Sequence, residues 1–120
     1  MAKAAAATIY HNPACSTSRK VLAAIREAGV EPRIVEYLKT PPDRATLADL
    51  VRRAGLTPRQ AMRTKGALWL ELGLDDPARG DDAILDALAA NPVLIERPIV
   101  VTARGVRLCR PPERLAEILG

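Results

Sequence analysis

The stretch AATIYHNPACSTSRKVLAAIREAGVEPRIVEY, residues 6–37, determines the fold class that the sequence predicts. Residues 6–10 form a short apolar run followed by Asn-Pro, which is typical of a buried strand that ends in a loop. Apolar side chains then recur at helical spacing from Cys15 onward, and Gly29 stands where a helix usually ends. A second apolar run, over residues 32–37, predicts another strand. Strand, helix and strand within about thirty residues predict a βαβ unit with parallel strands.

The residues after this unit predict a helical insertion. Thr40-Pro41-Pro42 is a firm break, and the next stretch, about 43–92, is mostly helical in its spacing. Its first helix is expected to open with a capping pair formed by Thr46 and Asp49. The helices expected in the insertion lie near residues 46–54, 57–62, 67–72 and 81–90.

The last part of the chain predicts a return to the sheet. Residues 98–101 and 106–109 are apolar runs that flank Ala103-Arg104-Gly105, which indicates a β-hairpin. Pro111-Pro112 then opens a final helix. We therefore expect an α/β protein with the order βαβ, helical insertion, ββα. We expect a single domain over residues 1–120, with its helices packed on a small mixed sheet.

The composition limits the class of protein. The 120 residues, 48% of them hydrophobic, suffice for a core without disulfides or a metal. Two cysteines form no disulfide framework, and a single histidine does not support a structural zinc site. Residues 1–7 are too short for a secretory signal, and no apolar stretch is long enough to span a membrane. We expect a protein of the reducing cytoplasm without a membrane partner.

The net charge of +4 comes without a basic run that carries interleaved aromatic residues, so no nucleic-acid partner is expected. Most of the basic residues are arginines. A planar guanidinium suits a small anionic substrate, but arginines scattered among acidic residues also make an ordinary solvated surface. Both interpretations stay open at this point.

Cys15 is the main candidate for chemistry because it precedes the first predicted helix. Unpaired N–H groups and the helix dipole favour an anion there, and the thiolate is the nucleophilic form of cysteine. The hydroxyls of residues 16–18 could cap the helix or help to hold an oxyanion. The alternative is an inert, buried thiol, which is our interpretation of Cys109 at the end of the last strand.

The residues near this thiol in sequence are His11 and Arg19. His11 could add positive charge, and Arg19 lies one helical turn after Cys15. Arg97 and Arg110 stand at the ends of the hairpin strands and could reach the sheet edge where the first helix starts. Taken singly, each arginine is more often a surface residue than a site residue.

Several separated motifs together resemble the glutaredoxin-dependent arsenate reductase family. They run in the family's order from about Thr8 to Leu119. The motifs are YHNPACSTSR (residues 10–19), EYLKTPP (36–42), ERPIVV (96–101) and RLCRPPE (107–113).

This resemblance implies a thioredoxin-like fold with a helical insertion and a cis-proline at Pro98. It implies that Cys15 is the nucleophile and that His11 helps to lower its pKa. It also implies that Arg63, Arg97 and Arg110 bind the oxyanion and that Arg19 lines the same pocket. The implied substrate is arsenate, with glutathione as co-substrate, glutaredoxin as partner protein, and neither a bound cofactor nor a metal.

Two other functions stay open on the sequence. A regulator that resembles the Spx proteins would share the fold, but position 18 is Ser, so the usual Cys-x-x-Cys switch is missing. A monothiol oxidoreductase acting on glutathione mixed disulfides would need Cys15 but not the arginines.

Overall fold

The computed structural model describes residues 6–119, which fall into two compact units. The sheet unit comprises Met1–Thr40 and Arg97–Gly120, and the insertion unit comprises Pro41–Glu96. The insertion expected at about 43–92 lies inside the second unit, and a single domain over the whole chain stays a prediction. Most of the segment 1–7, assessed above as a possible signal, lies outside the described residues.

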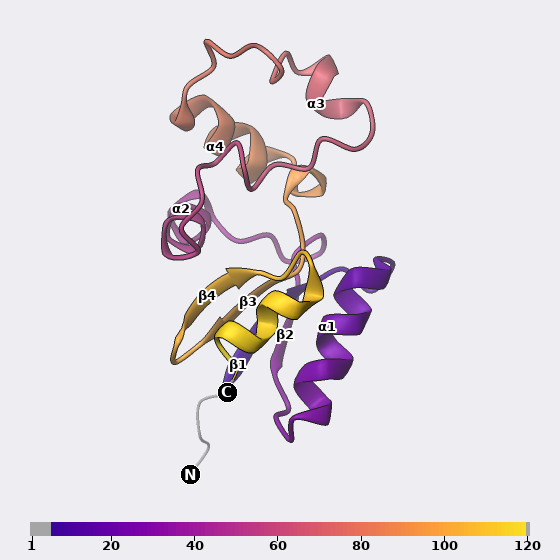
Figure 1. Cartoon of the computed structure of the whole chain (residues 1–120). Helices are drawn as coiled ribbons and strands as arrows, with labels where there is room; N and C mark the ends of the chain where they lie inside the picture. Colours follow the sequence, from indigo (N-terminus) through magenta and orange to yellow (C-terminus); the bar gives the residue numbers. More distant parts are fainter. Residues whose placement is uncertain (1–5, 120) are drawn as a thin grey trace. The chain divides into compact units, whose positions relative to one another are not determined.

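The sheet unit is built on a four-stranded mixed sheet in the order β2-β1-β3-β4. Figure 1 labels these strands. The β1 and β2 strands are parallel, whereas β1 with β3 and β3 with β4 are antiparallel. The predicted βαβ unit and hairpin are therefore confirmed. The strands are β1 (Ala7–His11), β2 (Arg33–Glu36), β3 (Ile99–Thr102) and β4 (Gly105–Leu108).

Helix α1 (Ser16–Glu27) and the 3₁₀ helix η2 (Pro112–Glu117) cover one face of this sheet. Helix α1 ends as predicted, because Gly29 takes a φ of 85° and its N–H donates to the Arg26 carbonyl at 3.0 Å. The core between helices and sheet is aliphatic and contains one thiol. Its buried members are Ala7, Ile9, Val21, Ile25, Val100, Cys109, Leu115 and Ile118.

The final helix has 3₁₀ rather than α geometry. It is only six residues long and begins at Pro112, so few intrahelical bonds are available to it. Its end is fastened to the sheet, because the Thr102 hydroxyl donates to the Ile118 carbonyl at 2.7 Å.

The insertion unit contains α2 (Arg44–Arg53), α3 (Leu68–Glu71), α4 (Asp81–Ala90) and the 3₁₀ helix η1 (Pro92–Leu94). The predicted capping pair was wrong. Helix α2 begins earlier, and its cap is Asp43, whose Oδ1 accepts from the Thr46 backbone N–H at 2.7 Å. Thr46 therefore lies inside the helix rather than at its cap.

The helix predicted over residues 57–62 was also wrong. The Ala61 N–H closes one turn onto the Thr57 carbonyl, and the chain then turns away. Met62 pairs with Ile95 in an antiparallel bridge, and the Arg63 N–H donates to the Leu94 carbonyl at 2.6 Å. Pairing with residues 94–96 therefore takes the place of further helical hydrogen bonds.

Within residues 6–119, no helix is both long and apolar enough to cross a lipid bilayer.

Candidate active site

Cys15 lies in the turn between β1 and α1 and forms the N-cap of that helix. Its backbone is extended (φ −92°, ψ 122°), and its N–H donates to the Asn12 carbonyl at 3.0 Å. Its own carbonyl accepts from the Arg19 N–H at 3.0 Å, which closes the first helical turn. The thiol is half-buried. The sulfur is thus held at the positive end of a three-turn helix while still open to reagents.

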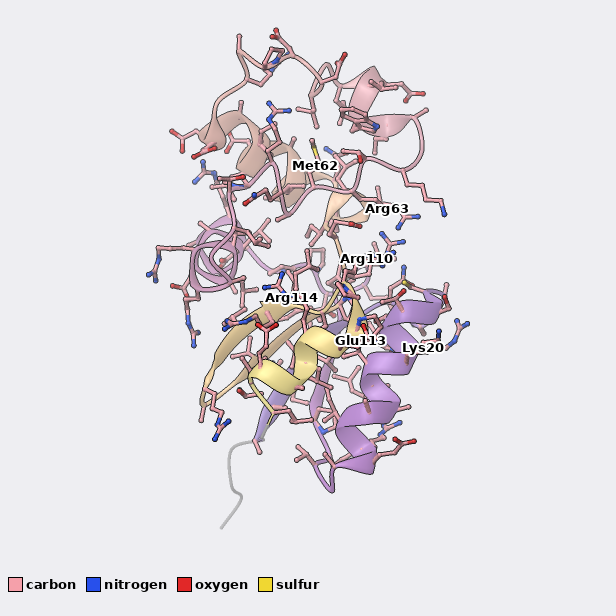
Figure 2. The ribbon with its side chains drawn as sticks, viewed as in Figure 1. Lys20, Met62, Arg63, Arg110, Glu113 and Arg114 are labelled. Atoms are coloured by element: carbon pink, nitrogen blue, oxygen red, sulfur yellow. The ribbon has the colours of Figure 1, made fainter. Side chains whose placement is uncertain are left out.

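Two arginines from the hairpin reach this sulfur. Arg110 donates from Nη1 to Cys15 Sγ at 3.9 Å and to the Arg97 carbonyl at 3.1 Å. Figure 2 shows Arg110 near the end of the sheet where α1 begins. The Arg97 side chain, which is buried, also hydrogen-bonds to the thiol.

The strand register explains why residues so far apart in sequence meet. Tyr10 pairs with Ile99 at the end of β1, and Ile99 pairs with Leu108 across the hairpin. The end of β1, the start of β3 and the end of β4 therefore lie at one edge of the sheet. Arg97 precedes β3 and Arg110 follows β4, so both lie beside the residue that follows β1. The expectation that these two arginines reach this edge is confirmed.

The surroundings of Cys15 lower its pKa below the usual thiol value. Burial acts in the opposite direction and is the largest single influence. It is outweighed by hydrogen bonds from the Ser18 backbone N–H and from the Arg97 and Arg110 side chains, together with the charge of Arg97. The thiolate is therefore favoured at this position, as a nucleophilic role requires.

His11 contacts the thiol region through Ser18. Its Nδ1 lies 2.6 Å from the Ser18 hydroxyl, which also accepts from the Asn12 N–H at 3.1 Å. Because a hydroxyl oxygen can accept two hydrogen bonds as well as donate one, the direction of the bond between Ser18 and Nδ1 is set by the tautomer of the imidazole.

Burial is the main cause that lowers the pKa of His11; the Glu36 charge opposes it, and the Arg19 and Arg26 charges add to it. The lowered pKa favours the neutral imidazole, and a positive charge on His11 beside the thiol stays a prediction. An influence of His11 on the thiol pKa through Ser18 stays a prediction. The sequence placed Ser18 among possible caps or anion donors, and its link to His11 has no local sequence signal.

The other predicted arginines have different surroundings. Arg19 is exposed, and its Nη1 donates to the Pro13 carbonyl at 2.8 Å. Arg63 belongs to the insertion unit, where its backbone pairs with Leu94. Roles of Arg19 and Arg63 in binding an oxyanion stay predictions.

Cys109 is a thiol of the core, as expected. It is fully buried, and burial raises its pKa to about 12. Its thiol donates to the Arg107 carbonyl at 3.8 Å. The peptide bond between Arg97 and Pro98 is cis, as the resemblance implied.

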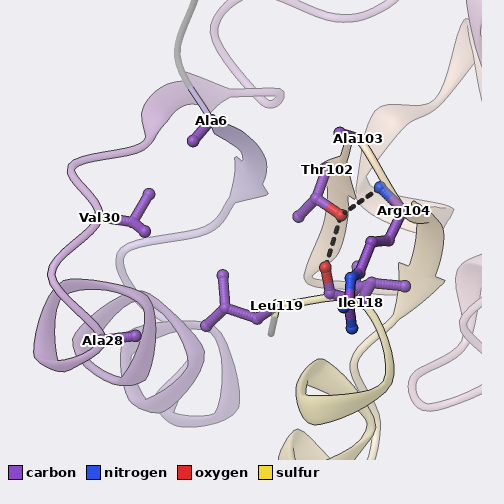
Figure 3. A pocket seen from close by; sticks show the side chains of 8 residues that line it. All are labelled: Ala6, Ala28, Val30, Thr102, Ala103, Arg104, Ile118 and Leu119. Carbon is purple, nitrogen blue, oxygen red and sulfur yellow. Dashed lines mark hydrogen bonds between the residues drawn. The ribbon is translucent and has the colours of Figure 1, made fainter.

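A pocket of about 390 Å³ lies at the other end of the sheet unit, where β1 starts and β3 ends (Figure 3). Alanines and aliphatic side chains form most of its wall, and the Thr102 hydroxyl in it already bonds to Ile118 and Arg104. Its lining residues include neither a thiol nor an imidazole, and its one hydroxyl is already engaged, so we place the chemistry at the Cys15 end of the sheet.

Several known proteins are similar to this chain over most of its length. Residues 10–118 match the ArsC family. An arsenate reductase of Rhizobium meliloti (strain 1021) is 59% identical over 112 residues, covering 93% of this chain and 80% of that protein. An arsenate reductase of Escherichia coli (strain K12) is 49% identical, covering 93% and 79%. The solved structure of an arsenate reductase from Vibrio cholerae superposes with a TM-score of 0.91 at 45% identity, covering 98% of this chain and 100% of that one.

Proposed function

As a member of the ArsC family, this chain is an arsenate reductase, and we propose that Cys15 is its nucleophile and that glutathione and glutaredoxin supply the reducing thiols. The observation that carries the proposal is the sulfur with a lowered pKa at the start of α1, in hydrogen-bond contact with Arg110 and Arg97. Such a group combines a nucleophile with fixed positive charge for an oxyanion.

The reaction begins with attack of the Cys15 thiolate on the arsenic atom. A sulfur–arsenic bond forms, and one arsenate oxygen leaves as water after taking up protons. Glutathione then adds through its own sulfur and displaces a second water. The glutaredoxin thiolate attacks the glutathione sulfur, so that the two sulfurs leave as a mixed disulfide and arsenic takes up two electrons. Hydrolysis of the remaining bond releases arsenite and restores the Cys15 thiol.

Arg97 and Arg110 have two tasks in this scheme. Before attack they favour the thiolate, and during attack their N–H groups stabilise the negative charge that develops on the arsenate oxygens. Arg63 would complete a set of three guanidiniums around the tetrahedral anion, as the family resemblance implies. A planar fork of donors suits this ligand better than an ammonium group does.

External thiols are required because the chain offers no resolving cysteine near the site. Cys109 is buried, and its pKa of about 12 keeps it protonated. The scheme needs no bound cofactor, and glutathione acts as a co-substrate. A cytoplasmic location fits, since glutathione keeps thiols reduced there.

The test is a reconstituted assay with the purified protein, arsenate, glutathione and glutaredoxin, with arsenite as the measured product. We expect arsenite only when all components are present, no product from Cys15→Ser, and near-normal rates from Cys109→Ala. Equal rates for Cys15→Ser and the unchanged protein would falsify the proposal. Full activity without glutaredoxin would exclude glutaredoxin as the partner protein and leave the role of Cys15 unchanged.

A second candidate, a monothiol oxidoreductase, is favoured by one observation: the acidic Cys15 stands in a Cys-x-x-Ser arrangement that ends at Ser18. This activity would not need an anion site. Arg97→Ala and Arg110→Ala separate the two functions through the KM for arsenate and the rate of exchange with a glutathione mixed disulfide. Arsenate reduction predicts a large rise in the KM for arsenate in both variants. If the KM for arsenate and the rate of disulfide exchange both stay unchanged, the alternative is favoured, because it does not need the arginines.

A further inference from the structure

Two side chains of α1 hold the turn that carries the nucleophile. We call residues 12–15 the thiol loop. At its start, the Asn12 N–H donates to the Ser18 hydroxyl at 3.1 Å. In its middle, the Pro13 carbonyl accepts from the Arg19 guanidinium at 2.8 Å. Each anchor is a side chain of the helix that the thiol loop leads into.

Few other contacts hold the middle of the thiol loop. Pro13 and Ala14 are exposed, so packing restrains them little. The Ala14 N–H donates to Asn12 Oδ1 at 3.0 Å, and the Cys15 N–H donates to the Asn12 carbonyl. Both bonds lie within the thiol loop and move with it. The contact from Arg19 to Pro13 is the bond that ties this exposed part to the helix.

The position of the sulfur depends on the thiol loop. Cys15 is both the last residue of the thiol loop and the cap of α1. Its sulfur accepts a hydrogen bond from Arg110, and the Ser18 N–H and the Arg97 side chain also lower the pKa of the thiol. These bonds stabilise the thiolate only while the sulfur is held within their reach. Only Ala14 lies between Pro13 and Cys15, so a change in the orientation of the Pro13 peptide also moves Cys15.

Arg19 also acts on His11 through its charge, which adds to burial in lowering the imidazole pKa. A neutral ring with its proton on Nε2 accepts from the Ser18 hydroxyl at Nδ1, whereas a charged ring only donates. The charged groups around this part of the site are Glu36 on β2, Arg19 and Arg26 on α1, Arg97 before β3 and Arg110 after β4.

We propose that Arg19 is a positioning residue, which holds the Pro13 carbonyl and thereby keeps Cys15 in its capping geometry, and that it is not a ligand of the oxyanion. This role goes beyond the proposed reaction and does not depend on which thiols reduce the arsenic. It assigns to Arg19 a task different from the one that the family resemblance implies.

The test uses three variants of the full chain. Arg19→Gln removes the charge and shortens the donor, whereas Arg19→Lys keeps the charge and one long donor. Lys20→Gln is the matched control, because Lys20 is the next residue of α1, is exposed, and is labelled on that helix in Figure 2. Thermal unfolding of each variant checks that the fold is retained.

The first measurement is the rate of Cys15 alkylation by iodoacetamide as a function of pH, without arsenate. We expect Arg19→Gln to move the profile to higher pH, with alkylation about threefold to tenfold slower near pH 6.5. Arg19→Lys should recover at least half of the loss, and Lys20→Gln should match the unchanged protein. An unchanged profile in Arg19→Gln overturns the proposal.

The second measurement is arsenate affinity by calorimetry in the Cys15→Ser protein, where the thiol no longer contributes. Adding Arg19→Gln should change the dissociation constant by less than about twofold. A loss of about tenfold or more, with or without a shifted alkylation profile, identifies Arg19 as an anion ligand and overturns the proposal. Failure of the glutaredoxin assay leaves both measurements intact, so the two proposals fail separately.

Discussion

The guanidinium of Arg110 lies 3.9 Å from the sulfur of Cys15, although 95 residues of chain separate them. The same nitrogen holds the Arg97 carbonyl. One side chain therefore both contacts the nucleophile and fixes the backbone of the second arginine of the site.

This relationship predicts that Arg110→Ala raises the pKa of Cys15, because the variant loses a hydrogen bond to the thiolate and the restraint on Arg97. Less thiolate is then present at neutral pH, and we expect alkylation at pH 7 to slow by about tenfold. The alkylation rate of Arg110→Lys should lie between those of Arg110→Ala and the unchanged protein. Arg114→Ala, on η2, is the control because Arg114 pairs with Glu117 and does not touch the sulfur. Equal slowing in both alanine variants would contradict the assignment.

His11 predicts a fall in stability on mild acidification. Its pKa is lowered in the folded state, so the unfolded chain takes up a proton below about pH 6.5 that the folded chain resists. The contribution of His11 to the free energy of unfolding is fully present above this pH. It is lost as the pH falls through the folded pKa, by at most about 1.4 kcal/mol per pH unit.

The measurement for His11 is the free energy of unfolding between pH 5 and 7.5 in the Cys15→Ser protein, which removes the titration of the thiol. Carboxylates with lowered pKa values titrate below this range in both states; they are Glu31, Asp43 and Glu117. Adding His11→Gln should flatten the profile. A slope that survives this substitution must come from another group.

Cys109 should be inert in the folded protein. Iodoacetamide at pH 8 should add one label per native chain, at Cys15, and two labels in denaturant, as counted by mass spectrometry. The folded pKa of Cys109 is about 12, above the ordinary thiol value of 9.0, so above about pH 9 the unfolded chain loses a proton that the folded chain keeps. The contribution of Cys109 to the free energy of unfolding is therefore fully present below about pH 9 and declines as the pH rises toward 12. Two labels on the native chain would show that the core thiol is accessible.

Ile25 on α1 is fully buried against the sheet, so truncation leaves a cavity. We expect Ile25→Ala to lower the free energy of unfolding by about 2–5 kcal/mol in a chemical denaturation experiment. The matched control is Ile34→Ala on β2, where the side chain is 38% exposed and the loss should be clearly smaller. Similar losses at both positions would mean that α1 is not anchored through this residue.

The parts of the fold that the sequence predicted well are those set by local pattern. Residues 6–37 carry both periodicities of the βαβ unit, and Gly29 ends α1 with the φ of 85° that its residue type favours. The hairpin was predictable for the same reason. By contrast, Thr57-Pro58 opens a turn that satisfies local rules, but Met62 pairs with Ile95, 33 positions later, and no local signal reports that pairing.

The site follows the same division. Cys15 was found from its place before a helix, which is a local property. The approach of Arg97 and Arg110 depends on β3 lying beside β1, and the sequence alone does not determine strand order. The bond between His11 and Ser18 depends on the angle at which α1 leaves the thiol loop, which residue types do not encode singly.

The placement of both arginines beyond β2 and the insertion has a consequence for protein synthesis. A ribosome adds Cys15 before the whole insertion, and it adds Arg97 and Arg110 only after the insertion. Until then the sulfur lacks two of the hydrogen bonds that favour its charged form. The Cys15 thiol of the nascent chain is therefore less ionised and reacts more slowly. It becomes fully nucleophilic only when the hairpin of β3 and β4 pairs with β1.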